Sequence, residues 1–325
     1  MKSIPELHDI IEKELSLLNY PSNPKILYQP IKYVLDIGGK RMRPILMLLS
    51  HQLFCSEINK SLKSALAIEV FHNFTLLHDD IMDDAPLRRG SKTVHEKWDV
   101  NTAILSGDTM LVQSYELISE VEDKNLREVL DVFNKAAREV CEGQQWDMDF
   151  ENRKDVTILD YLKMIEYKTS VLLAAALKIG AINAGASKEE TDNIYQFGVN
   201  MGIAFQLKDD LLDAFGNPEN FGKQVGGDIL SKKKTYLYLK ALQNANSVQL
   251  QSLLNCFSSD NNEKNIDKVK SIFLELGIPK LTLDLMNEYY DKAMVHLDAI
   301  ESNNKEPLVL FAKQLKATKT RYFSA

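Results

Sequence analysis

The sequence has few cysteines, no long apolar run and no concentration of basic residues. Its three cysteines are far apart and form no CxxC pair, which excludes the usual zinc and disulfide frameworks and predicts reduced thiols of a cytoplasmic protein. No stretch reaches about 18 uninterrupted apolar residues and no signal-peptide pattern is present, so no transmembrane segment is expected. The formal net charge of −7, without a basic stripe, argues against a nucleic-acid partner.

Strand-like alternation, low-complexity segments and linker composition are also missing. Apolar residues recur at helical spacing instead, and Ser3 with Glu6 and Ser187 with Glu190 form predicted capping boxes. The sequence therefore predicts a single all-α domain over residues 1–325, a large helical bundle with a central active-site cavity. Helices are expected from Ser3, over 30–36, 45–54, 61–84 and 102–121, from 125, over 158–184 and 187–213, from 228, and from 241 onward with breaks near 258–260, 277–279 and 303–307.

A first aspartate cluster closes the expected helix 61–84. Asp79, Asp80 and Asp83 are three and four residues apart, and a helix brings side chains at that spacing onto one face. Like charges placed so repel one another unless a cation lies between them. Mg²⁺ binds carboxylate oxygens and is usually coordinated by substrate phosphates as well. A single DDxxD is nevertheless more often a solvated helix end.

The spacing recurs after a second mostly apolar stretch, at Asp209, Asp210 and Asp213, 130 residues later (209 − 79). Two acidic clusters on buried helices are a poor way to build a surface. Facing one another across a bundle, they could hold metal ions as carboxylates do in other bundle sites. The repeated motif therefore predicts a metal-binding active site.

Basic residues accompany the first cluster. Arg88 and Arg89 follow it directly, and arginine forks suit phosphate oxygens. The segment 38–44 reads GGKRMRP, with glycines that allow close approach of a ligand and three bases at a helix start that suit an anion. Taken alone, such a turn is usually a solvated loop, and it lacks the GxxxxGK[ST] frame of a Walker loop. Acids that hold metal beside bases that hold phosphate indicate diphosphate chemistry.

With these motifs the sequence resembles the trans-isoprenyl diphosphate synthases, or polyprenyl synthases, the family of farnesyl and geranylgeranyl diphosphate synthases. The matching blocks lie between Gly38 and Thr235 in the family's order: GGKRMRP, FHNFTLLHDDIMDDAPLRRG, EGQQWD, MIEYKT, FQLKDDLLD and GGDILSKKKT. The resemblance implies head-to-tail condensation of isopentenyl diphosphate with an allylic diphosphate, about three Mg²⁺ ions per active site, and a homodimer.

The resemblance also implies a role for each matching residue. The metal ligands would be Asp79, Asp80, Asp83, Asp209, Asp210 and Asp213. The allylic diphosphate would contact Arg88, Lys168 and Lys233, with help from Lys223, and isopentenyl diphosphate would contact Gly39, Lys40, Arg43, His72 and Arg89. Thr169 and Gln206 would turn their oxygens toward the developing carbocation. Lys233 is chosen among three consecutive lysines by counting back from Thr235.

Product length is expected to depend on the helix before the first cluster. In the family, the residues five and four before the first aspartate form the pocket floor, here Phe74 and Thr75, and Phe71 lies another turn away. An ideal helix places His72 closer to the aspartate face than Phe74, so this assignment rests on the resemblance. A bulky ring at the floor predicts C15 to C20 products, with geranylgeranyl diphosphate favoured.

Two other functions stay open. A class I terpene cyclase also combines an all-α bundle with an aspartate-rich motif, but its second metal motif usually contains Asn and Ser or Thr. A non-catalytic modulatory subunit of a prenyl synthase would be expected to have lost acidic ligands, whereas this chain keeps both clusters.

Overall fold

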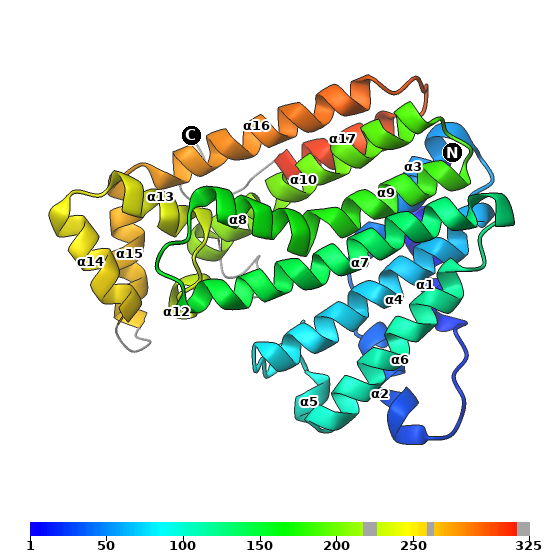
Figure 1. The fold of residues 1–325 in the computed structure, drawn as a ribbon, viewed down its shortest axis with the longest axis horizontal. Coiled ribbons are helices and arrows are strands. Elements are labelled where there is room, and N and C mark those ends of the chain that lie inside the picture. Colours follow the sequence, from blue (N-terminus) through cyan, green and yellow to red (C-terminus); the bar gives the residue numbers. More distant parts are fainter. Residues whose placement is uncertain (217–225, 259–262, 317–325) are drawn as a thin grey trace. The chain divides into compact units, whose positions relative to one another are not determined.

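The computed structural model describes residues 1–216, 226–258 and 263–316. Within them the chain is almost entirely helical (Figure 1), and the predicted all-α class is confirmed. Two short strands, β1 (Leu87–Arg88) and β2 (Ser91–Lys92), form a hairpin. In these ranges no helix combines the length and the apolar character needed to cross a bilayer.

Contacts between Cα atoms divide the chain into two compact units, which are described separately. The first unit comprises Met1–Lys135, Ala175–Tyr195 and Ala299–Leu308, and the second comprises Ala136–Ala174, Gln196–Asp298 and Val309–Ala325. The expected single domain stays a prediction, as does the expectation that the two acidic clusters face one another.

The first unit contains α1 (Ile4–Ser16), α2 (Lys25–Asp36), α3 (Met42–Phe54), α4 (Asn59–Met82), α5 (Val94–Lys97) and α6 (Val100–Ile118). The second unit contains α8 (Ile158–Ile165), the π-helical turn η1 (Glu166–Ser170), α12 (Gly227–Leu230), α13 (Tyr236–Asn244), α14 (Ser247–Ser258), α15 (Glu263–Glu275) and α16 (Ile278–Asp298). Residues of both units occur in α7 (Asp123–Asn152), α9 (Val171–Asn183), α10 (Lys188–Phe215) and α17 (Glu306–Lys316).

Both predicted capping boxes are present. Ser3 accepts a hydrogen bond from the backbone N–H of Glu6, whose side chain accepts from the backbone of Ser3. Ser187 and Glu190 repeat this reciprocal pair before α10. Each box satisfies backbone donors that a helix start leaves without a partner, which is why the sequence marks these starts reliably.

The helix expected from Pro30 begins earlier, at Lys25, so Pro30 lies inside α2. Proline has no backbone N–H and removes one hydrogen bond from a helix interior. Pro30 is buried together with Ile31 and Leu35, and their burial offsets that loss.

The helix expected from Asp228 ends after little more than one turn, at Leu230. Lys232 has a φ of 55°, in the left-handed region where a helix cannot continue. The next helix, α13, begins at Tyr236 with Thr235 as its N-cap residue. Lys233 and Lys234 therefore lie in the non-helical segment between α12 and α13.

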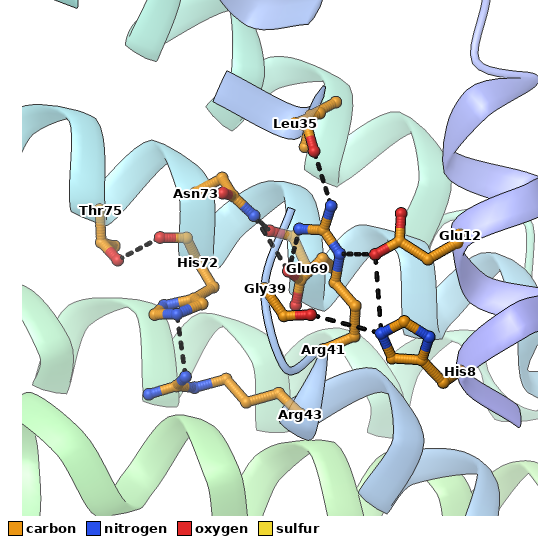
Figure 2. A network of polar contacts seen from close by, with 10 residues as sticks. All are labelled: His8, Glu12, Leu35, Gly39, Arg41, Arg43, Glu69, His72, Asn73 and Thr75. Atoms are coloured by element: carbon orange, nitrogen blue, oxygen red, sulfur yellow. Dashed lines mark hydrogen bonds and ion pairs between the residues drawn. The ribbon is translucent and has the colours of Figure 1, made fainter. Parts of the chain in front are cut away.

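Arg41 ties the GGKRMRP segment to its surroundings (Figure 2). The buried guanidinium donates from Nε to Glu12 Oε1 at 2.7 Å, from Nη1 to Glu69 Oε1 at 2.8 Å, and from Nη2 to the carbonyl of Leu35 at 2.6 Å. These partners belong to α1, α4 and α2. Arg41 therefore fixes the turn that carries Gly39 and Arg43 against three helices.

Replacing Arg41 with methionine should leave Glu69, which is 2% exposed, without the cation that neutralises it. Because an uncompensated buried charge is costly, we expect Arg41→Met to lower the free energy of unfolding by about 3 kcal/mol, measured by urea denaturation. The double variant Arg41→Met/Glu69→Gln should regain part of that loss. An equal loss in the single and double variants would contradict this account.

Candidate active site

The two arginines after the first acidic cluster are presented by a tight hairpin. Leu87 pairs with Lys92 and Arg88 with Ser91. The two turn residues, Arg89 and Gly90, have φ angles of 53° and 77°, as a type I′ turn requires. Strands this short leave no alternation in the sequence, which explains why no strand was expected here.

Arg88 lies against the first acidic cluster. Its Nε and Nη2 atoms lie 2.7 and 2.6 Å from Asp80 Oδ1, and Nη2 lies 3.6 Å from Asp79 Oδ2. Asp80 is 5% exposed, and burial raises its pKa although Arg88 opposes the shift. Asp83 is exposed and is the C-cap residue of α4. A residue expected to bind diphosphate thus neutralises a residue expected to bind metal.

Arg43 and His72 form a second pair, with 3.0 Å between Arg43 Nη1 and His72 Nε2 (Figure 2). A guanidinium only donates hydrogen bonds, so Nε2 must accept and the ring proton lies on Nδ1. Burial lowers the pKa of Arg43 to about 10. Burial and the nearby arginine charges hold the pKa of His72 well below its ordinary value. The buried Nε of Arg43 has no hydrogen-bond partner within the described chain.

Gly39 makes room for Arg89. A Cβ at Gly39 would lie 2.6 Å from Nη1 of Arg89, and Gly39 has a φ of 155° that other residues rarely adopt. Burial lowers the pKa of Arg89, although the carboxylate of Glu69 opposes the shift. Lys40 is exposed. The structure therefore groups Gly39 with Arg89 and Arg43 with His72, as the resemblance implied for one diphosphate.

Two of the residues expected to limit product length, Phe71 and Phe74, belong to an aromatic cluster of the first unit. The ring centroid of Phe74 lies 5.4 Å from that of Phe71 and 4.8 Å from that of His78, and the ring of Phe71 lies 5.3 Å from Phe133. Thr75 donates its hydroxyl to the backbone carbonyl of His72 at 2.8 Å. A small cavity of this unit is lined by Asp80, Arg88 and Arg89 but not by Phe74. The role of Phe74 in product length stays a prediction.

In the second unit, two lysines meet at one carboxylate. Lys168 in η1 lies 2.6 Å from Asp147 Oδ2 on α7, and Lys233 lies 3.4 Å from the same oxygen. Burial alone raises the pKa of Asp147, but the two lysine charges outweigh it and hold the pKa below its ordinary value. Asp147 was not among the predicted site residues, although it belongs to the EGQQWD block.

Asp210 is the most buried carboxylate of the second cluster, at 5% exposure. It accepts a hydrogen bond from the hydroxyl of Tyr161, and its Oδ1 accepts from Nε2 of Gln206 at 3.0 Å. Burial and the charge of Asp228 raise its pKa well above the ordinary value. Gln206 in turn accepts from the hydroxyl of Thr169 at 3.1 Å, so these groups form one chain of hydrogen bonds. Neither Tyr161 nor Asp228 was predicted.

Asp213 makes local contacts after the second cluster. Its Oδ2 accepts from the backbone N–H of Asp228 at 3.0 Å, and its carbonyl accepts from the N–H of Gly226 at 2.7 Å. Lys234 donates to the carbonyls of Phe150 and Glu151 in the last turn of α7, where a cation suits the helix C-terminus. Lys223 lies outside the described residues.

A cavity of about 100 Å³ gathers most of these groups in the second unit. Its lining combines charged and polar groups with the apolar side chains of Met164, Ile165 and Phe150. Such a mixture suits a ligand that combines a charged head with a hydrocarbon. The polar lining residues include Asp147, Tyr161, Lys168, Thr169, Gln206, Asp210, Asp228 and Lys233.

The acidic residues fit a hard divalent cation such as Mg²⁺. Asp80 and Asp210 both have raised pKa values because they are buried near other carboxylates, and a cation there would relieve the repulsion. Among the residues that the structure describes, no group of three His, Cys, Asp or Glu side chains could hold an ion alone. Mg²⁺ is usually bound by one or two carboxylates together with substrate phosphates.

Comparison with known proteins shows which family the chain belongs to. The family model for polyprenyl synthetase matches residues 24–276. A geranylgeranyl diphosphate synthase of Methanosarcina mazei is 45% identical over 224 residues, covering 68% of this chain and 69% of that protein. A geranylfarnesyl diphosphate synthase of Natronomonas pharaonis is 34% identical, with 94% of both chains covered.

Solved structures are similar over nearly the whole chain. A crystal structure of a geranylgeranyl pyrophosphate synthase has 45% identity and a TM-score of 0.93, covering 98% of this chain and 100% of that one. The geranylgeranyl pyrophosphate synthetase of Pyrococcus horikoshii has 33% identity and a TM-score of 0.91, with 97% of both chains covered. The family expected from the sequence motifs is confirmed: the chain belongs to the polyprenyl synthetase family.

Proposed function

We propose that this protein condenses isopentenyl diphosphate head-to-tail with an allylic diphosphate, releases diphosphate, and makes geranylgeranyl diphosphate as its main product. Membership of the family makes the chain a prenyltransferase, and the family uses a divalent metal with isopentenyl and allylic diphosphates. The observation that carries the proposal is the single cavity that Lys168, Lys233 and Asp210 all line. Relatives named geranylgeranyl diphosphate synthase support the product.

The allylic diphosphate would be bound by Lys168 and Lys233. Breaking the C–O bond builds negative charge on the departing diphosphate, and two ammonium groups already held near one another stabilise that charge. In the free protein Asp147 holds both lysines, which keeps them oriented before the ligand arrives. Bound Mg²⁺ would add Lewis-acid stabilisation of the leaving oxygens. We assign about three such ions to the six aspartates of the two clusters.

The carbocation would lie near Thr169 and Gln206. Because Thr169 donates its proton to Oε1 of Gln206, the lone pairs of its hydroxyl oxygen stay available to a positive charge. The apolar side chains of Met164 and Ile165 line the same cavity and help exclude water from the cation.

Isopentenyl diphosphate would bind in the first unit. Arg43 and Arg89 are cationic, and neutral His72 offers a donor at Nδ1, so the group can bind a diphosphate. Gly39 supports the site by allowing Arg89 to approach, and exposed Lys40 adds charge. The released diphosphate is our candidate base for the final proton.

We also propose a homodimer. Val100, Ile104 and Val112 are exposed apolar residues at helical spacing along one face of α6, and such a face favours association. A cytoplasmic location is likewise retained as a prediction.

The function is tested by product analysis. Purified protein would be incubated with Mg²⁺, radiolabelled isopentenyl diphosphate and, in separate reactions, dimethylallyl, geranyl and farnesyl diphosphate, with a chelator-treated sample as control. A C20 prenyl diphosphate, lost with the chelator, is the expected product. Cyclised hydrocarbon would favour a terpene cyclase, and no turnover with any primer would favour a non-catalytic subunit.

Phe74→Ala should lengthen the product, because removing the ring extends the pocket beyond the floor that the family resemblance places at Phe74. Products of Phe74→Ala and of a control, Phe273→Ala, would be compared by thin-layer chromatography. The control removes a similarly buried ring from α15 in the second unit and should leave the product length unchanged. If Phe74→Ala keeps the wild-type length, the floor lies elsewhere.

A further inference from the structure

Two side chains that we assign to the site of the second unit, those of Lys168 and Thr169, come from a π-helical turn. The sequence predicts one helix over 158–184, but η1 (Glu166–Ser170) interrupts it between α8 and α9. The backbone N–H of Val171 bonds to the carbonyl of Glu166, and the hydroxyl of Ser170 bonds to the carbonyl of Ile165 at 3.3 Å. A π-helical turn is rare and occurs often at functional sites. Something outside the turn has to stabilise it.

One neighbour is α7, which approaches through Gly143. A Cβ added at Gly143 would lie 2.8 Å from Cα of Lys168 and 2.8 Å from the carbonyl carbon of Tyr167. Non-bonded carbons prefer separations of about 3.5–4.0 Å, so no larger residue fits without moving the turn. One helical turn further along α7, Asp147 accepts the hydrogen bond of Lys168.

The other neighbour is α10, which repeats this arrangement through Gly202. A Cβ there would lie 2.6 Å from Cα and from Cβ of Ser170, both in η1. One helical turn further along α10, Gln206 accepts the hydrogen bond of Thr169. Each neighbouring helix thus supplies a glycine that touches the backbone of η1 and, four residues later, a polar group that holds one of its side chains.

We infer that Gly143 and Gly202 are positioning residues, which clamp η1 between α7 and α10 and so set the places of Lys168 and Thr169. The clamp rests on the proposed prenyl transfer, because these two side chains matter only if they act on an allylic diphosphate. Glycine in a helix interior costs stability relative to alanine. Close approach to the turn explains why two helices carry glycine at these positions.

The test compares Gly143→Ala and Gly202→Ala with matched controls on the same helices, Glu142→Ala and Gln196→Ala, whose side chains are exposed. The first readout is amide hydrogen exchange of the peptide covering 164–171, without metal or substrate. Faster exchange is expected in the glycine variants and unchanged exchange in the controls. Exchange at the wild-type rate in both folded glycine variants would overturn the clamp.

A second readout uses Trp146, whose ring stacks on Tyr167 of η1 at 5.1 Å between centroids. The sequence has two tryptophans, so Trp146 is the single one left in a Trp98→Phe background. Gly143→Ala should shift its fluorescence to longer wavelength, because the contact between α7 and η1 opens. An unchanged spectrum would contradict the clamp on the α7 side.

Activity gives the third readout. Each glycine variant should lose about 100-fold in kcat while the KM for isopentenyl diphosphate, whose proposed site is in the first unit, changes little. A kcat within about twofold of the wild type would overturn the inference. If wild-type protein makes no prenyl product, the proposed function fails, whereas exchange and fluorescence still decide the clamp. If both glycine variants fail to fold, hydrogen exchange of η1 in the wild-type protein decides instead. Amides of η1 that exchange as fast as those of a frayed helix end would overturn the inference.

Discussion

Carboxylates that are held away from water lose the hydration of their charge, and the rest of the site depends on how each negative charge is balanced. Asp80 is balanced by Arg88, and Asp147 by Lys168 and Lys233. Asp210 is held by hydrogen bonds from Tyr161 and Gln206, and its pKa is raised. The balancing cations are the groups that we assign to diphosphate binding. Binding of metal and diphosphate would therefore exchange partners within ion pairs that each unit already contains.

The backbone around these charges departs from regular helix where a side chain has to be presented. Arg41, Arg89 and Lys232 adopt left-handed φ angles at the turns beside the basic groups. The π-helical turn η1 carries Lys168 and Thr169. Such conformations cost free energy and persist only where the surroundings determine them. These conformations are held in place by buried ion pairs, as at Arg41, and by close contacts with glycine, as at Gly143.

The sequence predicted the features that follow from local patterns. Capping boxes marked the starts of α1 and α10, apolar spacing marked most helices, and the repeated DDxxD marked both acidic clusters. Features that depend on contacts between distant segments were missed. Asp147 meets Lys233 across 86 positions of the chain, and Tyr161 meets Asp210 across 49. Neither contact has a periodic signal, and η1 reads as ordinary helix because its residues match a helical pattern.

The most direct measurement is calorimetric titration of Mg²⁺ into the protein, without and with inorganic diphosphate. If the carboxylates hold the ion only together with phosphate oxygens, diphosphate should tighten Mg²⁺ binding by about 100-fold, within the range of typical coupling between ligands. Equal affinity in the two titrations would contradict the account, because the aspartates would then form a complete metal site by themselves.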